Sequence, residues 1–111
     1  MRKIKYRTWN KEEKKMFYGI ERTYDGYEED SFASYLYSPN KYIVMQFTGL
    51  KDKNDKDIFE GDIVEIQQHP DIFYTGEVKY VNGCFSINGI MIGTVCNKNL
   101  RILGNIYEKE D

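Results

Sequence analysis

Residues 44–66 read VMQFTGLKDKNDKDIFEGDIVEI, and this stretch decides the fold. Two apolar, strand-like runs flank a polar, turn-rich centre, and Gly61-Asp62 opens the second run. Alternating apolar residues bounded by turn formers are typical of β-strands. We therefore predict strands over residues 42–48 and 63–66, which together form the spine of a small β-barrel.

The N-terminal end predicts a hairpin. Residues 4–9 (IKYRTW) alternate with β-branched and aromatic members, as strands do. The polar residues 10–15 turn the chain, and residues 16–18 (MFY) return as a short second strand. The loop is longer than the minimal two residues.

The C-terminal half predicts further strands. Asn82-Gly83 lies within an apolar and aromatic run, residues 73–87, and Asn-Gly supplies the positive φ values of a type I′ turn. Residues 69–71 (HPD) end the strand that precedes this run, because proline has no N–H to donate to a neighbouring strand. A last strand covers residues 100–107, with Gly104 as a bulge or a point of close approach.

Residues 19–40 predict mostly loop. Ser31 can cap a short helix over residues 32–36, and Pro39 prevents that helix from continuing. A chain of 111 residues is long enough for one domain with a modest core. The expected fold is a single mainly β domain over residues 1–111, a small, partly open SH3-like or OB-like β-barrel with one short helix.

Composition is that of an ordinary globular protein, except that aromatic residues reach 15%. The net charge of −2 conceals an asymmetry: residues 1–15 carry seven basic side chains against two acidic ones, and residues 16–40 carry one against five. Met1 is followed by charged residues, and no apolar run approaches the length of a membrane span, so we expect a cytoplasmic protein. Cys84 and Cys96 are then expected to be reduced and buried.

Three groups of residues invite a chemical interpretation. A calcium loop counted from Asp52 would need an oxygen ligand, a glycine and a glutamate where Lys56, Asp57 and Ile63 stand, so no metal is expected. Glu60 and Asp62 lie two apart like a catalytic pair, but Gly61 between them favours a turn-closing role. A catalytic pair of His69 with Cys84 or Cys96 stays an alternative, because catalytic groups that are distant in sequence can meet in the folded chain. We expect neither a cofactor nor an enzyme.

A nucleic-acid interface is the alternative. Single-strand binders combine cations with aromatic stacking surfaces, and small barrels often serve that role. The N-terminal hairpin interleaves both types of side chain. The candidate residues are Arg2, Lys3, Lys5, Tyr6, Arg7 and Trp9. The sequence pI near 5.5 and the lack of another basic cluster argue against this interface.

Three blocks of sequence resemble the YopX family of phage and prophage proteins. They are RKIKYRTWNKEEKKM at the start, residues 44–66 in the middle and ILGNIYE near the end. The family pattern has Asn-Gly where this chain has Asn54-Asp55, and aspartate tolerates the left-handed region less well than glycine, which argues against a two-residue type I′ turn. The tail after the last block is also shortened.

The resemblance implies a small β-barrel encoded in a phage genome, with no activity and no site residues to carry over. We therefore expect a non-enzymatic accessory protein acting through protein contacts or as a homo-oligomer. The surplus of tyrosine and phenylalanine supports this expectation, because small domains leave much of their surface exposed. Nucleic acid is a possible partner, and a membrane is not expected.

Overall fold

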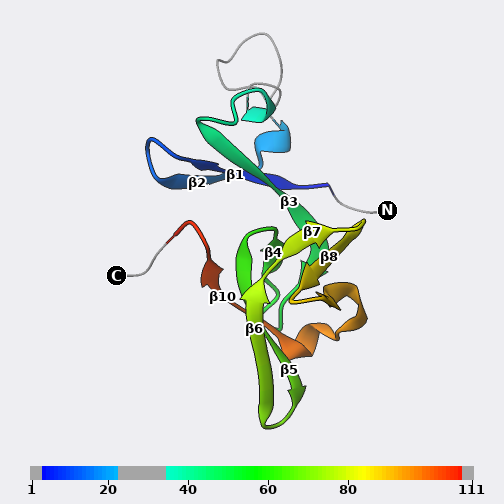
Figure 1. Cartoon of the computed structure of the whole chain (residues 1–111). Helices are drawn as coiled ribbons and strands as arrows, with labels where there is room; N and C mark the ends of the chain where they lie inside the picture. The colour runs from blue at the N-terminus through cyan, green and yellow to red at the C-terminus, as the bar shows by residue number, and fades with distance from the viewer. Residues whose placement is uncertain (1–3, 23–34, 109–111) are drawn as a thin grey trace. The chain divides into compact units, whose positions relative to one another are not determined.

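The computed structural model describes residues 4–22 and 35–108, and these residues form a mainly β chain (Figure 1). They divide into two compact units, Met1–Phe47 and Thr48–Asp111. The strand β3 (Tyr42–Lys51) crosses the boundary between the units, so each unit holds one part of it. The prediction of one domain over residues 1–111 stays a prediction.

The first unit contains the predicted N-terminal hairpin. Strands β1 (Tyr6–Asn10) and β2 (Lys15–Tyr18) pair antiparallel, with η1 (Ile20–Arg22) after them. The side chain of Asn10 organises the loop, because its Oδ1 accepts hydrogen bonds from the backbone N–H groups of Glu12 and Glu13, both at 3.0 Å. The first part of β3 pairs with the other edge of β1, in the sheet order β2-β1-β3-β4.

The second unit holds the remaining strands in short antiparallel ladders. Its strands are β4 (Asp57–Phe59), β5 (Asp62–His69), β6 (Ile72–Glu77), β7 (Lys79–Val81), β8 (Cys84–Ile87), β9 (Ile90–Met91) and β10 (Leu100–Asn105). Two 3₁₀ turns, η2 (Ile92–Thr94) and η3 (Asn97–Asn99), lie between β9 and β10. The ladders have the orders β10-β5-β6 and β7-β8-β9.

A single aliphatic cluster forms the core of the second unit. Its members are at most 1% exposed: Ile58, Val64, Ile66, Val78, Ile87, Ile92 and Leu100. Burial alternates along β5 from Asp62 to Ile66, as the period-two pattern requires, and ends where the strand runs on to the exposed His69. The last two residues of β5 and the first four of β6 are exposed and lie outside this core.

Most predicted turns are confirmed. Asn82 and Gly83 both have positive φ values, 53° and 81°, which fits the expected type I′ turn. Asn88 and Gly89 repeat that geometry between β8 and β9, a second turn that the sequence reading missed. The register of β10 against β5 shifts between Ile102 and Gly104, so the predicted bulge is present.

The prediction of a mainly β fold that fits a small, partly open β-barrel is confirmed. The predicted helix over residues 32–36 lies mostly outside the described residues, which include only Tyr35 and Leu36 of it, both helical. Within residues 4–22 and 35–108, no helix combines the length and hydrophobicity needed to cross a bilayer.

Candidate functional site

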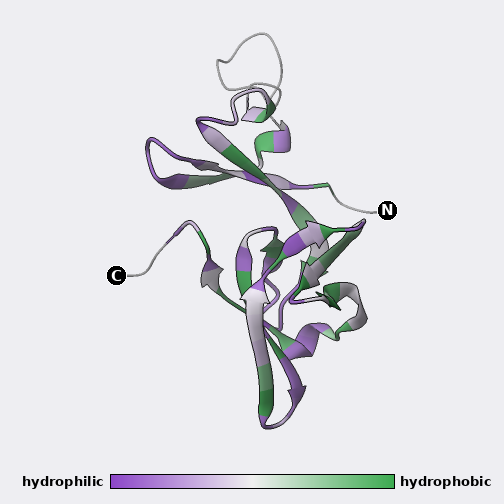
Figure 2. Ribbon diagram, in the orientation of Figure 1, coloured by the Kyte–Doolittle hydropathy of each residue, from purple (hydrophilic) through white to green (hydrophobic). Residues whose placement is uncertain are grey.

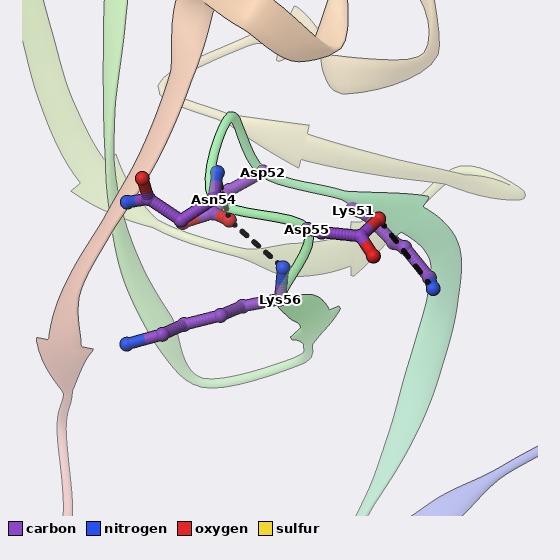
Figure 3. A network of polar contacts seen from close by, with 5 residues as sticks. All are labelled: Lys51, Asp52, Asn54, Asp55 and Lys56. Carbon is purple, nitrogen blue, oxygen red and sulfur yellow. Dashed lines mark hydrogen bonds and ion pairs between the residues drawn. The ribbon is translucent and has the colours of Figure 1, made fainter.

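The turn between β3 and β4 is built around the carboxylate of Asp52 (Figure 3). Asp52 Oδ1 accepts hydrogen bonds from the backbone N–H groups of Asn54 at 2.9 Å and Lys56 at 3.0 Å. Its Oδ2 accepts a third from the N–H of Ile102 at 3.0 Å, fifty residues away in β10. This carboxylate therefore shapes its own turn and ties that turn to the last strand.

The charge of Asp52 is favoured in this position. Burial alone would raise its pKa, but the hydrogen bonds from Ile102, Lys56 and Asn54, with the positive charge of Lys56, outweigh burial and lower it. With three backbone donors on its two oxygens, the carboxylate serves the fold. Among the described residues, no group of three acidic, histidine or cysteine side chains could hold a metal ion.

Asp55 holds the left-handed position of this turn. Its φ is 64°, its N–H donates to the carbonyl of Asp52 at 3.0 Å, and the N–H of Asp52 donates to the carbonyl of Lys56 at 2.9 Å. This is a three-residue connection in which a left-handed residue follows a type I turn. The expectation that the turn is not a two-residue type I′ turn is confirmed.

The acidic pair at the start of β5 is divided between two environments. Asp62 is 2% exposed, and its Oδ2 accepts a hydrogen bond from the N–H of Phe59 at 2.8 Å. Gly61 between the pair has a φ of 86°, and its N–H donates to the carbonyl of Val78 at 3.0 Å. Asp62 closes the turn, as the glycine predicts, while Glu60 is half-buried.

The basic N-terminal hairpin presents fewer cations to solvent than its sequence suggests. Arg7 is only 3% exposed, and its guanidinium lies 6.0 Å from the ring of Tyr18. Lys5 is half-buried with its Nζ 5.0 Å from the ring of Phe47. A phosphate group cannot reach a guanidinium that is buried in this way.

The other candidates for a nucleic-acid interface contribute little exposed surface. Tyr6 and Trp9 are half-buried, and Arg2 and Lys3 lie outside the described residues. The exposed cations of this hairpin are Lys11 and Lys14, which share its loop with Glu12 and Glu13, and Lys15 at the start of β2. The predicted interface stays a prediction, now without Arg7 as a phosphate contact.

Both cysteines are free, but the prediction that they are buried is wrong. Cys84 is exposed directly after the Asn82-Gly83 turn, and Cys96 is exposed before η3. The prediction assigned them to the core because their neighbours are apolar or aromatic, yet Cys84 is the first residue after a turn and Cys96 lies between two 3₁₀ turns, so neither is inside a long buried strand. His69 is also exposed, at the end of β5.

The tip of the β5–β6 hairpin carries the most concentrated exposed apolar group of the second unit. Ile72, Phe73 and Tyr74 are consecutive and are 44%, 50% and 44% exposed. Neighbouring residues of a strand point to opposite faces, so both faces of the ribbon are open here. Figure 2 shows the hydrophobic colour at the start of β6, and Figure 1 shows this tip at the far end of the hairpin from β7 and β8.

We name this group, Ile72, Phe73 and Tyr74, the apolar tip. The sequence predicts that Phe73 belongs to the hairpin around Asn82-Gly83, but Phe73 pairs with Gln67 of β5. The signal was present: residues 72–76 contain no charge and follow Pro70-Asp71, which turns the chain.

Comparison with known proteins places the chain in a family. The family model described as "YopX protein" matches residues 5–110, nearly the whole chain. The chain belongs to the YopX family. The resemblance carried by the three sequence blocks is thereby confirmed.

A solved structure supports the fold of this YopX member. It is the crystal structure of protein EF1440 from Enterococcus faecalis, which matches with a TM-score of 0.64 and 22% identity. The match covers 96% of this chain and 95% of that one. At this identity it bears on the fold alone. No curated protein matches the chain.

Proposed function

We propose that this YopX protein is a phage- or prophage-encoded accessory protein of the host cytoplasm that acts through protein contacts, self-association included, and not as an enzyme. The observation that carries the proposal is the apolar tip. Three consecutive large apolar residues, each about half exposed, are unusual for a surface that only meets water. Such groups often mark protein-interaction sites.

Asp52, which suggested a calcium loop, and Asp62, which suggested a catalytic pair, have contacts that support a non-enzymatic role. The carboxylates of Asp52 and Asp62 accept hydrogen bonds from backbone N–H groups of their own turns. A general acid or base must instead reach a substrate. These two side chains are occupied in fold-forming bonds.

Light scattering coupled to size exclusion tests self-association. We expect the average molar mass to rise above that of a monomer as the protein concentration increases. Phe73→Lys should abolish this rise. Leu103→Lys is the matched control, because Leu103 is 45% exposed in β10, at the other edge of the same ladder. A monomer at every concentration, together with no Phe73-dependent partner from infected host cells, would contradict the proposal.

Single-stranded nucleic-acid binding is the second candidate, and the three exposed lysines of the β1–β2 hairpin, Lys11, Lys14 and Lys15, favour it. Their contacts would be phosphate contacts, which weaken steeply with salt. The test is oligonucleotide binding at low and physiological salt, with Lys14→Ala plus Lys15→Ala as the variant. Replacing Arg7 would confuse loss of contact with loss of packing, since this side chain is buried.

A further inference from the structure

The hydrogen-bonding direction of β6 can be assigned residue by residue. Val78, just after β6, donates to the carbonyl of Asp62 at 2.9 Å, so its backbone faces β5. Because backbone direction alternates along an antiparallel ladder, Tyr74 also faces β5, and Phe73 and Thr75 face outward. The carbonyl of Thr75 confirms this direction, since it accepts a hydrogen bond from Asn88 Nδ2 at 3.0 Å.

Parts of both outer edges of the β10-β5-β6 ladder are covered by other segments of the chain. On the β10 side, the Asp52 carboxylate takes the N–H of Ile102, and the N–H of Lys53 donates to the carbonyl of Leu100 at 2.8 Å. On the β6 side, Asn88 covers Thr75. By the same alternation, Phe73 and Glu77 are the other outward-facing positions of β6, and of the two only Phe73 lies in the apolar tip.

An open strand edge with apolar side chains is a template for pairing with another strand. Natural edges are usually protected by lysine, proline or a bulge. The edge strands β2 and β7 begin with Lys15 and Lys79, but residues 72–76 carry no charge. The strand that suits this edge is therefore uncharged and apolar, and β6 of a second copy has that chemistry.

Charge and backbone direction select one register for two antiparallel β6 strands. If Tyr74 faced its own counterpart, Asp71 of each copy would lie opposite Glu77 of the other, which is destabilising. If Phe73 faces its counterpart, Asp71 lies opposite Thr75 instead. In that register the two Phe73 residues, which face outward, exchange both backbone hydrogen bonds, and Ile72 lies opposite Tyr74 twice.

The geometry points to a twofold-symmetric dimer in which the β6 edges of two copies pair antiparallel with Phe73 opposite Phe73. This inference rests on the proposed self-association and specifies its surface. Two ladders join into one sheet of order β10-β5-β6-β6-β5-β10. The contact is isologous, so it closes at two copies and does not propagate.

The size of the apolar tip sets the strength of the dimer. Half-exposed side chains of this size contribute roughly 300 Å² per copy, so pairing covers about 600 Å² of them in total. That area is below the roughly 1,200 Å² of stable complexes. The dimer is therefore weak and reversible, and it requires measurement at protein concentrations from about 10 µM to 1 mM.

Disulfide trapping tests the register. In a Cys84→Ser, Cys96→Ser background, Ile72→Cys and Tyr74→Cys are oxidised separately and as an equal mixture. Residues opposite each other at such a non-hydrogen-bonded pair have Cα atoms about 4.5 Å apart, within the range that a disulfide bridges. Identical cysteines at either position lie about two residues apart along the strands, roughly 8 Å, which is too far.

We expect the mixture to form the covalent dimer at least tenfold faster than either variant alone, with mass spectrometry identifying the 72–74 bridge. Faster trapping by Tyr74→Cys alone would overturn the register. Trapping no faster than that of a chain retaining only Cys84 would overturn β6 pairing. If light scattering still reports association in that case, self-association stands on another surface; if it reports a monomer, both proposals fail.

Discussion

Asp52 offers the sharpest test of how this fold is stabilised, because one carboxylate serves two distant segments. We expect Asp52→Ala to lower the free energy of unfolding of the second unit by about 2–4 kcal/mol. Three backbone donors lose a charged acceptor, and bonds to charged groups contribute roughly 1.5–3 kcal/mol each. The expected total is below their sum, because water can reach the exposed Asn54 and Lys56.

Asp52→Asn separates hydrogen bonding from side-chain shape. The amide has nearly the same size, but only one of its two terminal atoms accepts a hydrogen bond. Either the turn donors or the N–H of Ile102 must then face another donor. We expect a loss of about 1–3 kcal/mol. Asp71→Asn, an exposed carboxylate in the β5–β6 turn, is the control and should change stability by less than about 0.5 kcal/mol.

The effect of Asp52 depends on pH with a defined sign. Its pKa is lower in the folded state than in the unfolded chain, so the stabilisation is complete above the ordinary carboxyl range near 4. It is lost as the pH falls through the lowered pKa. The stability difference between wild type and Asp52→Asn should therefore be full at pH 7 and should narrow steadily below about pH 4.

Urea unfolding followed by circular dichroism and by exchange of the Ile102 amide measures these effects. Fluorescence is less suitable, because Trp9, the single tryptophan, lies in the first unit. A loss under 0.5 kcal/mol for Asp52→Asn at pH 7, or a difference that does not change with pH, would refute the assigned role of the carboxylate.

Three further predictions concern the second unit. Asp55→Gly should raise stability by about 1 kcal/mol in urea unfolding, because the residue has a φ of 64° and glycine adopts that conformation without strain; no gain would mean that the aspartate compensates through other contacts. Gly76→Ala should lower the free energy of unfolding by about 1–3 kcal/mol, since its Cβ would lie 2.7 Å from Asn88 Nδ2 and 2.8 Å from Ile87 Cγ2. Gly93→Ala, with open space around it, should lower it far less. Equal losses for the two variants would contradict the close approach at Gly76. Both cysteines should react with a thiol reagent in the native state at rates within a few-fold of the unfolded chain, because both are exposed; protection of either one would place it back in the core.

Local patterns predicted the strands well. The alternation in residues 4–9, the Asn82-Gly83 turn and the Gly104 bulge depend on neighbouring residues, and each is present. The role of Asp62 was also accessible, because a glycine beside an aspartate describes a turn by itself.

Features that depend on distant pairing could not be predicted in this way. The burial of Arg7 depends on how β1 lies between β2 and β3, and the third bond of Asp52 depends on β10. The exposure of the apolar tip depends on which part of β5 and β6 reaches beyond the core. An apolar residue in a strand pattern is expected to be buried, and nothing local distinguishes Phe73 from Phe59, which is 5% exposed.

The bond from Ile102 to Asp52 has a consequence for synthesis on the ribosome. The turn that holds Asp52 leaves the ribosome long before β10, and β10 supplies both that donor and the core residue Leu100. While β10 is still being made, one side of β5 has no partner strand and the Asp52 carboxylate lacks its third donor. The second unit therefore completes its fold only after β10 has been made, and a nascent chain stalled before Leu100 should remain open to proteases and to chaperones that bind exposed aliphatic segments.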